Sequence, residues 1–139
     1  DIVHFLVLMD ESHLTINANK TAGIDEVIRM VREFRKYFGG LGLASQSIRD
    51  FIPDRADAEA VDKMKVLFEL TTYKFMMMQD SNSLPKIREA FQGSFSETEI
   101  ESIPMLEQGN CILSIAGDRN LRLNVRLQEE EQYYFDGGR

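Results

Sequence analysis

The chain opens with a nearly continuous run of hydrophobic positions. Residues 2–9 are apolar except for His4, and the run ends at two acids, Asp10 and Glu11. Such a run is typical of a strand that is buried on both faces in a parallel sheet. We therefore expect a central β-strand over residues 2–9, with both carboxylates at its carboxyl end.

The spacing of apolar positions then changes from strand to helix. Residues 24–38 repeat apolar side chains at helical intervals, and Gly39 and Gly40 are expected to end that helix. The short apolar run 41–44 is followed by polar residues, which predicts a second parallel strand. Residues 2–44 therefore predict a β-α-β unit.

The rest of the chain alternates in the same way before it turns antiparallel. The expected elements are a helix over 56–70, a strand over 72–78, a helix from Ser83 to Gly93, a helix opened by the capping box Ser96 to Glu99, and two strands over 111–116 and 121–127. This order predicts a three-layer α/β fold, with a mainly parallel sheet and an antiparallel C-terminal hairpin.

The amino-acid composition narrows the kinds of protein to which the chain could belong. A length of 139 residues, with 43% hydrophobic and 28% charged residues, suits one compact globular domain. The net charge of −7 argues against a general nucleic-acid binder, although a DNA contact elsewhere in a longer parent protein is left open. Cys111 lies in an apolar run, which predicts a buried structural thiol.

The termini and hydropathy add two expectations. No apolar stretch approaches the roughly 20 residues that span a bilayer, and the first residues do not form a signal peptide, so we expect a soluble protein. The chain begins without methionine and enters a strand at once, which is how an excised piece of a longer protein looks.

Candidate chemistry gathers where the first two predicted strands end. Open α/β sheets bind ligands at this edge. In P-loop nucleotide hydrolases the first acid holds Mg²⁺ through water and the next activates the attacking water, which assigns Asp10 to the metal and Glu11 to general base catalysis. Gln46 would sense the γ-phosphate or position the water, and Ser45 is assigned to nucleotide binding. Solvated loop acids and an ordinary strand-end amide are the alternative interpretation.

Two other classes of protein, helicases and zinc metalloproteases, fit the sequence less well. The sequence from Asp10 to His13 is similar to the Asp-Glu-x-His motif of helicases, but Ser45-Gln46-Ser47 stands where a helicase would carry a Ser-Ala-Thr type of segment. His13 has no neighbouring histidine or cysteine that would complete a zinc site.

An ordered set of short segments extends over almost the whole chain. The segments are residues 6–13, 35–37, 44–51, 73–75, 95–99 and 116–119. Together they resemble the C-terminal ATPase domain of the VirB4 family, the motor ATPases of type IV secretion and conjugation. The resemblance implies a RecA-like fold of the HerA and FtsK type that uses ATP and Mg²⁺.

The same resemblance implies an assembly and a location. It implies a homo-hexamer that works with secretion or conjugation channel proteins in the cytoplasm, at the inner face of the membrane. An arginine from a neighbouring subunit would then stabilise charge on the transferred phosphate. Arg119 is the first candidate for this arginine finger, and Arg35 and Arg49 are weaker ones.

The phosphate-binding loop Gly-x-x-x-x-Gly-Lys-Ser/Thr, known as Walker A, does not occur in the sequence. Residues 1–139 are therefore expected to be the C-terminal part of an ATPase domain, from the acidic Walker B strand onward, and to be inactive alone. Residues 128–139 would form a tail or a partner-docking segment. The alternative is a non-catalytic α/β interaction module that binds a secretion-channel partner.

Overall fold

The computed structural model describes residues 2–135. Its strands are β1 (Phe5–Met9), β2 (Gly39–Leu43), β3 (Tyr73–Met76), β4 (Asn110–Ile115) and β5 (Arg119–Asn124). Its α-helices are α1 (Thr21–Phe34), α2 (Ile48–Phe51), α3 (Ala58–Leu70), α4 (Leu84–Ala90), α5 (Glu97–Ser102) and α6 (Glu129–Phe135). Short 3₁₀ turns are η1 (Ser12–Leu14), η2 (Arg35–Tyr37), η3 (Ser81–Ser83) and η4 (Ile103–Met105).

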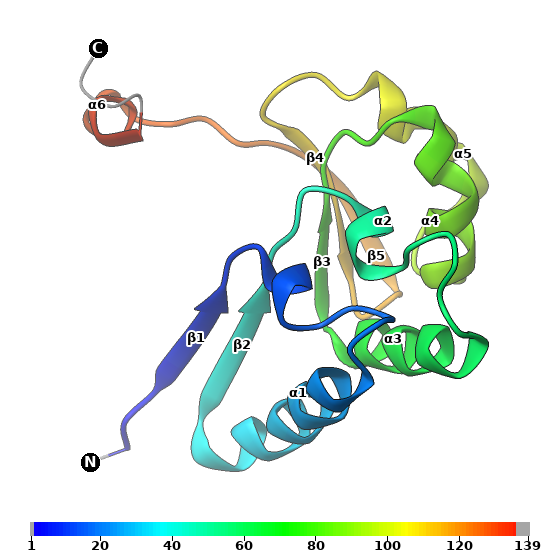
Figure 1. Ribbon diagram of the computed structural model, residues 1–139. Coiled ribbons are helices and arrows are strands. Elements are labelled where there is room, and N and C mark those ends of the chain that lie inside the picture. Colours follow the sequence, from blue (N-terminus) through cyan, green and yellow to red (C-terminus); the bar gives the residue numbers. More distant parts are fainter. Residues whose placement is uncertain (1, 136–139) are drawn as a thin grey trace.

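The strands form two sheets. β1 and β2 are parallel, with Val7 opposite Leu41, whereas β3, β4 and β5 are antiparallel in that order. Figure 1 shows α1 to α5 on one side of these sheets. The hydrophobic core lies between the helices and the sheets, and its fully buried members include Ile24, Met64, Leu67, Ile87, Ile103 and Ile112.

The first helix ends differently from the prediction. Helix α1 gives way to η2, and Phe38 takes a left-handed conformation with φ 58. Gly39 and Gly40 therefore do not stop the helix but begin β2, which corrects the sequence-based boundary. A Cβ atom at Gly39 would come within 2.3 Å of the Phe5 ring, so this ring lies against Gly39 and would have to move to admit a side chain there.

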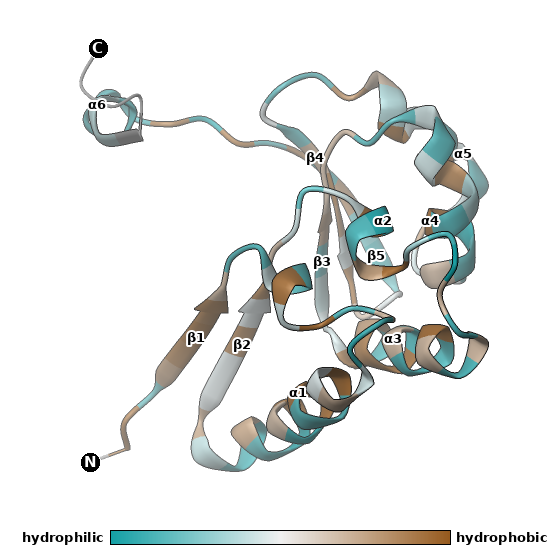
Figure 2. Ribbon diagram, viewed as in Figure 1, coloured by the Kyte–Doolittle hydropathy of each residue, from teal (hydrophilic) through white to brown (hydrophobic). Residues whose placement is uncertain are grey.

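Strand β1 is not buried on both faces, and that prediction is wrong for the described residues. Leu6 is 64% exposed and Leu8 is 74% exposed, while Phe5 packs edge-to-face on Phe34 of α1. Figure 2 shows β1 hydrophobic along its length although one of its faces has no helix over it. The apolar run indicates that both faces of β1 are suited to burial, and residues 2–135 cover one of these faces.

The expected α/β class and the antiparallel C-terminal hairpin are confirmed. The strand predicted over 72–78 is β3, which pairs with β4 and forms no ladder with β2. Parallel pairing among residues 2–135 is thus confined to β1 and β2, and helices cover one face of each sheet. The third layer expected from the element order is not supplied by this part of the chain.

The C-terminal segment extends away from the sheets and ends in α6 (Figure 1). Tyr133 and Tyr134 are 67% and 78% exposed, so these two rings do not fold back onto the core. Residues 136–139 of the expected docking segment lie outside the described residues, and docking remains a prediction. Cys111 is buried, as expected, and none of the helices in residues 2–135 is long and apolar enough to cross a membrane.

Candidate functional site

The two acids after β1 are held at the edge of the parallel pair by backbone and side-chain hydrogen bonds. Ser12 is buried, and its backbone N–H and its Oγ both donate to the carbonyl of Ala44, at 2.9 and 2.8 Å. The Ala44 N–H in turn donates to the Met9 carbonyl at 3.0 Å. These bonds tie the carboxyl ends of β1 and β2 together, so the residues after each strand lie side by side.

Glu11 and Gln46 meet at this edge. Gln46 Nε2 donates a hydrogen bond to Glu11 Oε1 at 2.6 Å. The structure thus brings together the acid and the amide that the sequence assigned to one site. Glu11 has a left-handed backbone, with φ 47 and ψ 40, which turns the chain sharply after the strand.

Asp10 lies beside this pair and is exposed. Its Oδ1 accepts the Glu11 backbone N–H at 2.9 Å. An exposed carboxylate at the end of a parallel strand suits a metal ion that keeps most of its water, which is how Mg²⁺ is usually bound. The arrangement fits the water-mediated metal role assigned to Asp10.

Ser45 directly precedes Gln46, and its hydroxyl contacts other side chains. Ser45 Oγ donates to Asp50 Oδ2 at 3.2 Å and lies 3.0 Å from His13 Nδ1. These bonds occupy the hydroxyl that the sequence assigned to nucleotide binding. Ser45 therefore supports the loop after β1 in this structure, and a nucleotide contact by Ser45 stays a prediction.

Sequence reasoning missed two members of this cluster, His13 and Asp50. Asp50 belongs to a capping box, in which Ser47 Oγ accepts the Arg49 N–H and Asp50 Oδ2 accepts the Ser47 N–H at 3.1 Å. The Ser-x-x-Asp spacing was a visible signal for this helix start. His13 carried no such signal, because its partners are remote in sequence.

The candidate arginines do not join this cluster. Arg119 pairs with Ile115, which pairs with Tyr73 at the amino end of β3, whereas Gln79, just after the carboxyl end of β3, donates to the Gln46 carbonyl. Arg119 thus lies near the amino end of β3, whereas Glu11 and Gln46 lie toward the carboxyl ends of the strands. An action in a neighbouring subunit remains a prediction.

Arg49 is engaged in an ion pair. Its guanidinium donates to Asp54 at 2.6 Å, and this bond raises the pKa of Arg49 above its ordinary value. The pKa of Asp54 is lowered by hydrogen bonds from Lys86 and Arg49. Arg35 opens η2 after α1, away from the cluster. The structure therefore favours a pairing role for Arg49 over a role as arginine finger.

Comparison with solved structures shows which proteins share this fold. The chain resembles the genome packaging NTPase B204 of Sulfolobus turreted icosahedral virus 2, solved with ATP-gammaS, with a TM-score of 0.63 and 17% identity over 88% of this chain and 52% of that chain. A second structure of the B204 DNA-packaging ATPase matches with a TM-score of 0.62 and 16% identity over the same shares. The chain therefore shares its fold with these two packaging ATPase structures.

The structure of VirB4 from Thermoanaerobacter pseudethanolicus is more similar still. It matches with a TM-score of 0.78 and 21% identity over 94% of this chain and 33% of that chain. The resemblance drawn from the sequence segments is therefore confirmed for the fold. This chain has the fold of the corresponding part of VirB4.

Among curated sequences, an uncharacterized protein of Bacillus anthracis is 30% identical over 138 residues, which is 99% of this chain. The chain spans about a fifth of the length of that relative, 21%. No family model matches the chain.

Proposed function

We propose that the chain is part of a VirB4-type ATPase motor, in which Glu11 is the general base. The observation that carries this proposal is the 2.6 Å hydrogen bond between Gln46 Nε2 and Glu11 Oε1 at the carboxyl edge of two parallel strands. Ligands of open α/β sheets bind at this edge. The similarity to VirB4 and to a packaging NTPase solved with ATP-gammaS supports a nucleotide as the ligand.

Each residue then has a distinct task. Glu11 accepts the proton of the attacking water, and Gln46, hydrogen-bonded to the same carboxylate, orients that water. Asp10 fixes the metal through its water shell. Bound Mg²⁺ supplies positive charge that offsets the charge developing on the transferred phosphate.

Other parts of a longer protein would complete the site. Most of the nucleotide contacts of such ATPases come from a glycine-rich loop that this sequence does not contain. The apolar face at Leu6 and Leu8 is uncovered, and β2 and β3 each keep one unpaired edge among residues 2–135. These features suit a chain that is covered and paired by further segments of its own protein.

The assembled motor is proposed to be a homo-hexamer with one site per subunit contact. Arg119, remote from Glu11 within one chain, would reach the site of the next subunit. The motor would power conjugative DNA transfer or type IV secretion from the cytoplasmic side of the membrane, bound there by channel proteins. Helix α6, with Tyr133 and Tyr134 exposed, is a candidate contact for such a partner.

The test is ATP turnover by the full-length protein that carries this chain. Glu11→Gln keeps the shape and the contact with Gln46 but removes the base, so kcat should fall about 10²–10⁴-fold while nucleotide binding persists. The matched control is Glu107→Gln, at an exposed glutamate outside the cluster. Its kcat should equal that of the unaltered protein.

The opposite result is equally clear. If the full-length protein hydrolyses ATP and Glu11→Gln turns over as fast as Glu107→Gln, Glu11 is not the base. If the full-length protein neither binds nor hydrolyses ATP, the alternative is favoured, a non-catalytic module. In that case, deleting residues 133–139 should abolish capture of a channel protein.

A further inference from the structure

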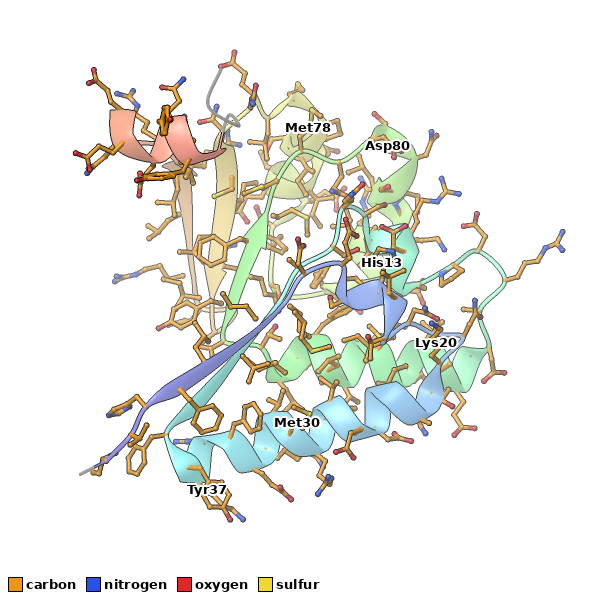
Figure 3. All side chains as sticks on the ribbon, turned by 60° about the vertical axis from the view of Figure 1, so that its left-hand side comes forward. His13, Lys20, Met30, Tyr37, Met78 and Asp80 are labelled. Atoms are coloured by element: carbon orange, nitrogen blue, oxygen red, sulfur yellow. The ribbon has the colours of Figure 1, made fainter. Side chains whose placement is uncertain are left out.

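His13 lies between the proposed general base and the end of β2. Its Nδ1 is 3.3 Å from Glu11 Oε2 and 3.0 Å from Ser45 Oγ. The His13 side chain is 23% exposed, against 37% for Glu11, so the ring is more buried than the carboxylate. Figure 3 shows His13 on the turn that follows β1, toward the same end of the molecule as Met78 and Asp80.

The protons of this cluster can be placed by counting donors. Ser45 has a single hydroxyl proton, and Asp50, 3.2 Å away, can only accept it. With that proton donated to Asp50, Ser45 Oγ accepts from His13, which puts a proton on Nδ1. Glu11 is also an acceptor, so the same Nδ1–H is shared between Ser45 Oγ, at 3.0 Å, and Glu11 Oε2, at 3.3 Å.

We propose that His13 is a positioning residue for Glu11. Its Nδ1–H holds Oε2, and Gln46 holds Oε1, so the carboxylate is fixed at both oxygens. The inference rests on the proposed function, since it assigns His13 a task in the same reaction. The charged groups that face His13 are Glu11, directly, and Asp50, through Ser45.

Positioning matters here because Glu11 is a long side chain at an exposed edge. Without His13 its carboxylate would be held at one oxygen, by an amide that is itself exposed. Small displacements of a catalytic group reduce rate strongly, on the order of 10²-fold for about 1 Å. Binding of the nucleotide does not depend on this orientation.

Two substitutions separate the hydrogen bond from the bulk of the ring. In His13→Asn the side-chain N–H sits where Nδ1 sits, and in His13→Gln it sits where Nε2 sits. In the full-length protein, His13→Asn should keep kcat within about threefold, while His13→Gln and His13→Leu should lower it on the order of 10²-fold. The affinity for a fluorescent ATP analogue and the Tm should stay unchanged in all three.

A second readout does not use turnover. In a ¹⁵N-histidine spectrum of the full-length protein, the signal that disappears in His13→Leu belongs to His13 and reports its tautomer directly. We expect the proton on Nδ1, and we expect Ser45→Ala to alter that signal. A proton on Nε2 would overturn the inference.

The outcomes distinguish the two proposals. If Glu11→Gln is inactive but His13→Gln and His13→Leu match the unaltered protein, the base stands and His13 has no positioning role. If Glu11→Gln remains active, the proposed function fails and the role of His13 fails with it. Rescue by asparagine alone, with Glu11→Gln inactive, supports both.

Discussion

At the scale of single residues, the left-handed backbone of Glu11 carries an energetic cost within the site. A left-handed backbone at a residue with a Cβ costs roughly 1–2 kcal/mol, and Glu11 has φ 47. The hydrogen bonds from Ser12 to the Ala44 carbonyl hold this turn in place. Retained strain of this kind is common where side chains must be aimed at a ligand.

The common position of these candidate residues could be predicted from the sequence, but their contacts could not. Asp10, Glu11 and Gln46 follow apolar runs, so the common edge could be inferred. Ser45 looked equally available, yet its hydroxyl is shared with Asp50 and His13. Nothing local encodes such a contact, because it depends on how two loops approach each other.

Gly23, near the start of α1, gives a prediction that opposes helix propensity. Alanine favours helix over glycine by about 1 kcal/mol, but a Cβ at Gly23 would lie 2.5 Å from the Thr15 carbonyl oxygen. We expect Gly23→Ala to lower the free energy of unfolding by about 1–3 kcal/mol. Urea denaturation measures this, with Ala58→Gly, at an exposed position of α3, as a control for propensity alone. A more stable Gly23→Ala variant would contradict the clash.

At the scale of elements, end signals explain which helices could be predicted. The capping box from Ser96 to Glu99 was expected, and α5 begins there with both reciprocal bonds formed. Helix α2 escaped prediction because it has only four residues and lies between polar segments. Gly39 and Gly40 were predicted to end the first helix but begin β2, since glycine is common both at helix ends and where a strand packs closely.

The α5 capping box also makes stability depend on pH. Burial raises the pKa of Glu99, but hydrogen bonds from the Ser96 N–H and from Asn120 outweigh it and leave the pKa below the ordinary value. A carboxyl with a depressed folded pKa stabilises above its unfolded value, near 4.3, and loses that contribution as pH falls through the folded value.

Replacing Glu99 tests this dependence. Glu99→Gln should lower the Tm at pH 6 and shrink the difference in Tm between pH 6 and pH 3. Glu101→Gln, at the exposed neighbour on the same helix, should leave that difference unchanged. Equal pH profiles for Glu99→Gln and the unaltered chain would show that the capping carboxylate contributes nothing to acid stability.

At the scale of the whole molecule, one side of the sheets has no helix layer within residues 2–135. Leu6, Leu8, Tyr73 and Phe75 are between 59% and 74% exposed on β1 and β3. Local sequence predicted strands that need cover on two faces but could not say which segment covers them. It also could not predict that β4 is the only partner of β3 within residues 2–135, because strand pairing depends on contacts remote in sequence.

This open face predicts self-association of the 139-residue chain. Exposed apolar patches and unpaired strand edges favour contacts between copies. Light scattering should show mass rising with concentration, and Leu8→Glu with Phe75→Glu should reduce the rise. Met105→Glu, at a residue 75% exposed on the helical side, is the control and should leave association unchanged. Equal association of all variants would mean that this face stays solvated.

Gln79 gives the two sheets a mechanical connection. Its carboxamide donates to the Gln46 carbonyl at 3.0 Å and accepts the Ile48 N–H at 3.4 Å, so one side chain following β3 grips the peptides on both sides of Ser47. A load that tilts the three-stranded sheet would pull on the segment that carries Gln46. Mechanical load on the three-stranded sheet would then be transmitted to Gln46 through the side chain of Gln79.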